Sequence, residues 1–280
     1  MTLHSIPNNS APKSAGVSAG SHVEVRGLSK VFRRGGRAVT ALEDLDFTVA
    51  PGEFVTVLGP SGCGKSTLLH ILGGFEEATS GEVEVAGSAV KEPGRDRGMV
   101  FQRATLFPWW NIQRNIAWPL EVDGVSRKEA RARADELIEL VGLTGFGDAF
   151  PGELSGGMQQ RAGIARTLSL EPEVLLMDEP FGALDAQTRE LMQEELNRIW
   201  EDSGTTVVFV THDIHEAVFL ADRVLVMSGR PGKIIADIPI DIERPRHHDV
   251  KGGAKFAGYH EQLWDLLRDE AIAAETRGRG

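Results

Sequence analysis

The nine residues GPSGCGKST, from Gly59 to Thr67, constrain the fold of this chain more than any other stretch. They fit the pattern G-x-x-x-x-G-K-[ST] and lie between a strand-like run, FVTVL, and a helix-like run, STLLHIL. Glycines let a backbone wrap closely around phosphate oxygens, with successive N–H groups pointing inward at the start of a helix. Average residue usage makes a chance match in a chain this long an event on the order of one per cent. The stretch therefore predicts a nucleotide site in an α/β fold.

The positions of this phosphate loop have different expected roles. Lys65 would reach the β- and γ-phosphates, and the Ser66 hydroxyl would hold Mg²⁺. Cys63 is the only cysteine of the chain, and a small residue without a reactive role is the simpler interpretation. The predicted nucleotide-binding residues of the loop are Gly59, Pro60, Ser61, Gly62, Cys63, Gly64, Lys65, Ser66 and Thr67.

Two later apolar runs end in residues that suit phosphate chemistry. The run VLLMDEP carries Asp178 and Glu179 at its end, and VFVTHD carries His212. Ligands of open α/β sheets bind at the carboxyl ends of the strands. We therefore assign Asp178 to Mg²⁺ and Glu179 to the attacking water, and we expect His212 to contact the γ-phosphate.

Strand-like and helix-like runs alternate along the chain, which predicts a mainly parallel sheet covered on both faces. Residues 1–20 are rich in Ser, Pro, Asn, Ala and Gly and are predicted to be a disordered leader. One domain is expected over residues 21–245. Residues 246–280 form a polar tail in which an apolar stripe predicts a short helix docked on that domain. The stripe consists of Phe256, Tyr259, Leu263 and Leu267.

The stretch LSGGMQQR, Leu154 to Arg161, contains no obvious acid, base, nucleophile or metal ligand. A helix-like run follows it at once. The bare, positive start of a helix is a place that a phosphate can approach, since its backbone N–H groups are unsatisfied. The Ser155 hydroxyl and the N–H groups of Gly156 and Gly157 would supply the donors.

Set in order, these pieces resemble the ATP-binding subunits of ABC transporters over about residues 22–245. The ordered elements are GPSGCGKST, Gln102 in VFQR, LSGGMQQR, VLLMDEP, GALD and THD. The resemblance implies a P-loop NTPase (RecA-like) core with a mainly parallel sheet. It also implies an N-terminal antiparallel β part and an inserted α-helical subdomain at about residues 103–155.

The resemblance assigns further residues to the site. It implies that Gln102 touches Mg²⁺ or the attacking water, and that Asp185 lies at a dimer contact. Phe32 stands where the family places an aromatic that stacks on adenine, although a core or edge-strand aromatic is the alternative. Met158 replaces the glutamine that usually follows the Ser-Gly-Gly of the signature. The side chain of Met158 cannot make a contact that depends on that amide.

The resemblance also implies a mechanism and partners. Two ATP molecules would be clamped in a homodimer, between the phosphate loop of one subunit and the signature of the other. The helical subdomain would dock on transmembrane permease subunits and, through them, on a substrate-binding protein. Trp109 and Trp110, in LFPWWNI, would lie near that docking groove or belong to the core. The chain would then be a peripheral protein on the cytoplasmic face of the cell membrane.

Several segments resemble importer subunits for nitrate, sulfonates, taurine and related small anions, namely GRDRGMVFQ, LFPWWN, EPFGALDAQTR and SGRPGKI. One alternative is an ABC-type ATPase that acts on nucleic acid or ribosomes. The formal charge of −11 opposes it, because phosphate binding needs a basic face. A small-molecule kinase is the other alternative, and such an enzyme would not need LSGGMQQR.

Overall fold

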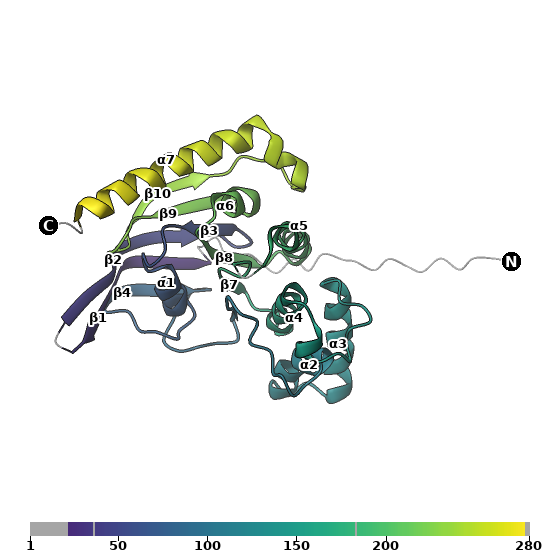
Figure 1. The fold of residues 1–280 in the computed structure, drawn as a ribbon. Coiled ribbons are helices and arrows are strands. Elements are labelled where there is room, and N and C mark those ends of the chain that lie inside the picture. The colour runs from purple at the N-terminus through teal and green to yellow at the C-terminus, as the bar shows by residue number, and fades with distance from the viewer. Residues whose placement is uncertain (1–21, 36, 183, 278–280) are drawn as a thin grey trace.

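The computed structural model describes residues 22–35, 37–182 and 184–277, so the predicted leader lies outside the described residues. Two sheets form the centre of the molecule, and helices cover them (Figure 1). A group of helices from the middle of the chain projects to one side, away from the smaller sheet (Figure 1). The sheets position the phosphate loop, and the projecting helices position the LSGGMQQR stretch.

The smaller sheet is antiparallel and has the strand order β2-β1-β4-β5. Its strands are β1 (Val23–Arg34), β2 (Arg37–Val49), β4 (Ser80–Val85) and β5 (Ser88–Ala89). β1 pairs with both β2 and β4, and Val23 and Val25 point into the core. The expected N-terminal antiparallel part is thereby confirmed.

The larger sheet has the strand order β10-β9-β3-β8-β7-β6. Its strands are β3 (Phe54–Leu58), β6 (Arg97–Val100), β7 (Val174–Asp178), β8 (Thr206–Thr211), β9 (Arg223–Met227) and β10 (Ile234–Pro239). Among the described strands of this larger sheet, only the β9–β10 pair is antiparallel. Strands buried on both faces are expected to be continuous apolar runs, which explains FVTVL, VLLM and TVVFVT. The mainly parallel core is confirmed.

Two apolar cores lie on the two faces of the larger sheet. The first contains residues of α1 (Lys65–Leu72) and of the smaller sheet. The second contains residues of α5 (Ala186–Ser203), α6 (Ile214–Leu220) and the projecting helices. The carboxyl ends of β3, β7 and β8 meet at one edge between these layers, because the three strands are parallel neighbours. The site residues at their ends are therefore brought together.

The projecting helices begin in the segment where an inserted helical subdomain was expected, at about residues 103–155, and extend beyond it through α4. They are α2 (Ile112–Val122), α3 (Arg127–Leu140), the short helix η1 (Pro151–Glu153) and α4 (Gly156–Leu168). Asn111 caps α2 and Ser126 caps α3, each by accepting a backbone N–H three residues later. The apolar face of α3 is buried against its neighbours through Ala130, Ala134 and Leu137.

The C-terminal tail forms η2 (His248–Gly252) and then α7 (Ala254–Arg277). Figure 1 shows α7, in yellow, running beside β10 and α6. Phe256 and Leu263 are buried, and Tyr259 and Leu267 pack at the margin of the second core. The stripe identified in the sequence thus faces the domain, on a helix of 24 residues rather than a short one.

Candidate functional site

The phosphate loop joins the end of β3 to the start of α1. Gly59 and Gly64 lie where the loop comes closest to neighbouring side chains and backbone. Gly64 has a φ of 113°, and a Cβ atom there would lie 2.7 Å from Cδ2 of Leu42. The ammonium group of Lys65 is buried, and it donates hydrogen bonds to the carbonyl oxygens of Gly59 (2.8 Å) and Pro60 (3.0 Å). These bonds hold the ammonium group of Lys65 against the carbonyl oxygens at the start of its own loop.

Ser66, in the first turn of α1, meets Asp178 at the end of β7. Its hydroxyl donates a hydrogen bond of 3.0 Å to Oδ1 of Asp178. Burial raises the pKa of Asp178, and the bond from Ser66 offsets this only in part. A hydroxyl and a desolvated carboxylate are oxygen ligands of the kind that Mg²⁺ takes together with substrate phosphates. The residues present therefore fit the ion that was expected.

Glu179 follows Asp178 and adopts a left-handed backbone conformation with a φ of 43°. Such a conformation is uncommon outside glycine and occurs often at functional sites. It directs the two carboxylate oxygens to two partners. Oε1 lies 3.8 Å from Nζ of Lys65, and Oε2 lies 3.1 Å from Nδ1 of His212 at the end of β8.

Gln102 approaches this group from the segment after β6. A Cβ atom at Gly182 would lie 3.3 Å from Nε2 of Gln102 and 3.9 Å from Oε2 of Glu179. The Gln102 amide and the Glu179 carboxylate therefore both lie next to Gly182. The structure brings together five residues that were predicted separately from four segments of the sequence. These are Lys65, Gln102, Asp178, Glu179 and His212.

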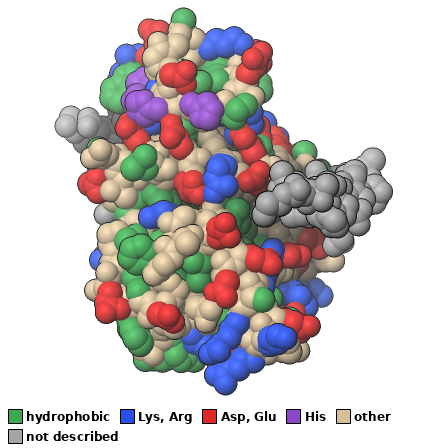
Figure 2. Space-filling view, turned by 90° about the vertical axis from the view of Figure 1, so that its right-hand side faces the viewer, with side chains coloured by type: hydrophobic (Ala, Val, Ile, Leu, Met, Phe, Trp, Pro, Cys, Tyr) green, Lys and Arg blue, Asp and Glu red, His purple; other side chains and the backbone are tan. Residues whose placement is uncertain are grey.

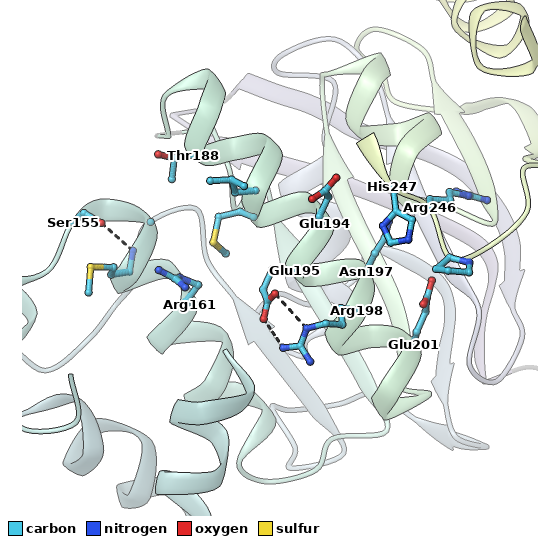
Figure 3. Close-up of a pocket in the computed structure, with 15 residues that line it drawn as sticks. Ser155, Arg161, Thr188, Glu194, Glu195, Asn197, Arg198, Glu201, Arg246 and His247 are labelled. Carbon is cyan, nitrogen blue, oxygen red and sulfur yellow. Dashed lines mark hydrogen bonds and ion pairs between the residues drawn. The ribbon is translucent and has the colours of Figure 1, made fainter. Parts of the chain in front are cut away.

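The Ser155-Gly156-Gly157 stretch lies at the start of α4, as Figure 3 shows for Ser155. The Ser155 hydroxyl accepts the backbone N–H of Met158 at 3.3 Å and so caps the helix. Ser155 and Gly156 are exposed, and Gly157 is buried against α5. A Cβ atom at Gly157 would lie 2.7 Å from Cγ2 of Thr188. The helix start is therefore open on one side and closely packed on the other.

Asp185 caps α5 beside that packing contact. Its Oδ1 accepts the backbone N–H of Thr188 at 3.0 Å, and hydrogen bonds from Thr188 lower the pKa of Asp185. The side chain is exposed, so it is also available to a second subunit. A groove of about 650 Å³ begins at Ser155 and Thr188 and follows α5 as far as His247 (Figure 3).

The three residues after the glycines of the signature have structural roles that the sequence did not reveal. Met158 packs against the second core. The Gln159 amide donates to the carbonyls of Pro151 (2.9 Å) and Leu154 (3.1 Å), which fixes the turn before α4. Gln160 is buried and donates to the carbonyl of Phe101 at 3.2 Å, next to Gln102. The sequence around Gln160 did not indicate this hydrogen bond, because Phe101 lies 59 residues away along the chain.

Phe32 and Cys63 occupy contrasting environments. Phe32 lies near the end of the β1–β2 hairpin and is 39% exposed, with Nζ of Lys30 4.9 Å from its ring centre. It is therefore not a core aromatic. Cys63 is buried, and burial raises the pKa of its thiol. A buried thiol with a raised pKa is a poor nucleophile, which favours the interpretation of Cys63 as a small packing residue.

Trp109 and Trp110 differ in exposure although they are adjacent. Trp110 packs against Phe107, with ring centres 4.9 Å apart, and against Trp118 at 5.6 Å. Trp109 is 65% exposed at the edge of this aromatic cluster. Trp110 therefore belongs to the packing of the helical part, whereas Trp109 presents a large apolar surface to solvent.

The fold and the arrangement of the site define an ATP-binding cassette. A family model described as "ABC transporter" matches residues 42–182, and the chain belongs to that family. It is 45% identical to the nitrate import ATP-binding protein NrtD of Synechocystis over 265 residues, which cover 90% of this chain and all of that protein. It is 48% identical to the taurine import ATP-binding protein TauB of Rhizobium johnstonii over 239 residues, 84% of this chain and 91% of that protein.

A solved structure shares the fold at a TM-score of 0.70. It is the dimeric, post-hydrolysis state of an ATP-binding cassette bound to ADP and Pi, and it is 33% identical to this chain. The match covers 79% of this chain and all of that one. Across the part of the chain that the structure describes, no helix is both long and apolar enough to cross a membrane.

Proposed function

We propose that this chain is the ATP-hydrolysing subunit of an importer for a small anion, and that two copies clamp ATP between them. The observation that carries the proposal is that the site consists of two separate surfaces, the phosphate loop and the start of α4. Lys65, Asp178 and Glu179 converge on the phosphate loop, whereas the start of α4 presents exposed donors without a catalytic group beside it. A phosphate between two such surfaces needs the donors of a second subunit.

Each residue of the site has a role in this proposal. Ser66 and Asp178 would hold Mg²⁺, which would supply positive charge against the negative charge that develops on the phosphate oxygens. Lys65 contacts the β- and γ-phosphates, and Phe32 stacks on adenine. Glu179 orients and deprotonates the attacking water, and Gln102, which also lies next to Gly182, touches Mg²⁺ or that water.

The second subunit completes the site. Ser155, Gly156 and Gly157 of one copy donate to the γ-phosphate held by the other, and Asp185 lies at the contact between them. ATP then binds the closed dimer better than the open one, and this difference drives the attached permease. The exposed Trp109 belongs to the surface that meets the permease at the cytoplasmic face of the membrane.

Mixing two inactive variants tests the composite site. Ser155→Arg blocks the signature but keeps its phosphate loop, and Lys65→Ala disables the loop but keeps its signature. Each alone is expected to be inactive, while an equal mixture regains part of the wild-type ATPase rate, because mixed dimers hold one intact site. A mixture as inactive as its components would contradict the composite site.

The proposed cargo, a small anion, is based on the names of two relatives. One is named for nitrate import and the other for import of taurine, an organic sulfonate. A strain lacking this chain should lose uptake of one labelled small anion, nitrate or an alkylsulfonate, and regain it with the wild-type chain but not with Glu179→Gln. Unchanged uptake of every such anion would contradict the cargo class. Figure 2 shows acidic and basic side chains interspersed on one face of the described chain, which gives no support to a nucleic-acid partner.

A further inference from the structure

The phosphate loop is contacted from outside by the turn at residues 228–232, between β9 and β10. The NH2 group of Arg230 donates a hydrogen bond of 3.0 Å to the carbonyl oxygen of Gly62, 168 residues away in the sequence. Gly232 lies against the same loop, since a Cβ atom there would be 2.3 Å from the carbonyl oxygen of Cys63. The turn and the loop therefore cannot move independently.

The Arg230 contact acts on one peptide group of the loop. A peptide is planar and trans, so its C=O and N–H point in opposite directions. The carbonyl of Gly62 points outward to Arg230, and the N–H of Cys63 in the same peptide points back toward Pro60 O, 3.4 Å away. Gly62 has a φ of 76°, a conformation open mainly to glycine. A guanidinium on the outer oxygen therefore holds the orientation of this peptide within the loop.

The turn is fixed on its other side by the C-terminal helix. Oε1 of Glu270, on α7, accepts the backbone N–H of Gly229 at 3.0 Å. The buried Ser228 hydroxyl donates to the carbonyl of Pro231 and accepts the N–H of Lys233, which closes the turn. Gly229 and Arg230 are adjacent, so one side of the turn is held by α7 and the other holds the phosphate loop.

We propose that Arg230 is a positioning residue that presets the phosphate loop for nucleotide, and that α7, through Glu270, sets the place of Arg230. The C-terminal helix thereby adjusts the affinity of the loop for ATP. Any partner or modification that displaces α7 from the 228–232 turn would weaken nucleotide binding without touching the site itself. The proposal rests on the proposed function only in taking the loop as the ATP site.

The test measures the affinity of the full chain for the fluorescent nucleotide mant-ATP with Mg²⁺, beside its melting temperature. Arg230→Met is expected to raise the Kd about tenfold, as for the loss of one charge-assisted hydrogen bond. Arg230→Lys, which keeps a cationic donor, should recover much of the affinity. The KM for ATP should rise while kcat changes little. Lys233→Met is the matched control, because it removes the same charge from a side chain that pairs with Glu43 instead.

A double-variant cycle tests the link to α7. Glu270→Ala should also raise the Kd, and Asp269→Ala, which removes the same charge one residue away, should not. Because both single changes act through Arg230, the pair Arg230→Met and Glu270→Ala should bind no more weakly than Arg230→Met alone. Additive effects would overturn the link, and an Arg230→Met affinity equal to that of Lys233→Met would overturn the role of Arg230. A wild-type chain that bound no mant-ATP would instead contradict the proposed function.

Discussion

Nδ1 of His212 lies 3.1 Å from Oε2 of Glu179, at the ends of two neighbouring parallel strands. An ionised carboxylate can only accept hydrogen bonds, so Nδ1 is the donor of this contact whenever Glu179 is ionised. His212 thus orients the carboxylate to which we assign the attacking water, and Nε2 can donate to the γ-phosphate when both ring nitrogens carry a proton. The two residues form one unit whose members can be separated by substitution.

Glu179→Gln is predicted to keep nucleotide binding and to lower the rate of ATP hydrolysis about 100-fold or more, as expected for the loss of a general base. The substitution preserves the size of the side chain and an oxygen that can face His212. Phosphate release and mant-ATP binding measure the two effects. Glu82→Gln, at an exposed position in β4, is the control and should leave both unchanged. Undiminished hydrolysis in Glu179→Gln would remove Glu179 from the catalytic role.

His212 is predicted to act in the reaction through Nε2 as well as through its contact with Glu179. Asn keeps a donor near the position of Nδ1, and Gln keeps one near that of Nε2. We expect His212→Asn to lose more hydrolysis than His212→Gln, because the phosphate contact is made only in the reacting complex. Greater activity in the Asn variant would show that His212 acts only by orienting Glu179.

Asp178 and Asp185 are predicted to give stability opposite dependences on pH. The pKa of Asp178 is raised by burial, so the folded chain binds that proton more tightly than the unfolded chain. Its contribution to stability therefore falls as pH rises from the ordinary aspartate value to the raised one. The pKa of Asp185 is lowered by its hydrogen bonds with Thr188, so its contribution is present above the ordinary value and is lost as pH falls.

The free energy of unfolding of Asp178→Asn and Asp185→Asn, measured in urea between pH 3 and 7, checks these two opposite pH dependences. Relative to the wild type, Asp178→Asn should become more stable as pH rises through this range. Asp185→Asn should become less stable, although asparagine also caps helices. Parallel curves for the two variants would contradict the environments that the structure gives these carboxylates. Asp178→Asn should in addition need more Mg²⁺ for hydrolysis.

Gly64→Ala is predicted to destabilise the fold more than Gly87→Ala, although both glycines have positive φ. A Cβ atom at Gly64 would meet Cδ2 of Leu42 and the carbonyl oxygen of Ala41, whereas one at Gly87 would meet nothing within 4 Å. Backbone strain should cost each variant about 1–2 kcal/mol. Gly64→Ala should lose about 1–3 kcal/mol more through overpacking, and nucleotide binding with it. Equal losses in urea unfolding would mean that Leu42 moves aside freely.

The sequence predicted those parts of the fold and site that depend on local pattern. The phosphate loop and the acidic end of β7 each lie within a few consecutive residues, so the local pattern alone located them. Strand–helix alternation predicted a mainly parallel sheet. That β7 and β8 are neighbours in it, which brings Glu179 and His212 together, is seen only in the structure.

Contacts between distant segments could not be predicted in this way. The hydrogen bond of Arg230 with Gly62 depends on how the β9–β10 turn packs beside β3, and no periodicity encodes it. The same holds for Gln160, whose amide reaches Phe101 because α4 lies against the end of β6. The two tryptophans illustrate the limit at short range as well. Their sequence left docking and core packing open, and the structure separates them by exposure.

Trp109→Ser is predicted to weaken binding to a membrane partner without loss of stability. Trp109 is 65% exposed, so little buried surface is lost, whereas Trp110→Ser would remove a ring that packs on Phe107 and Trp118. The measurement is recovery of a multi-spanning protein with the tagged chain from solubilised membranes, beside urea unfolding of both variants. Trp109→Ser should recover less partner while its free energy of unfolding stays at the wild-type value. Trp110→Ser should have a lower free energy of unfolding. Full recovery of the partner by Trp109→Ser would place the permease contact elsewhere on the helical part.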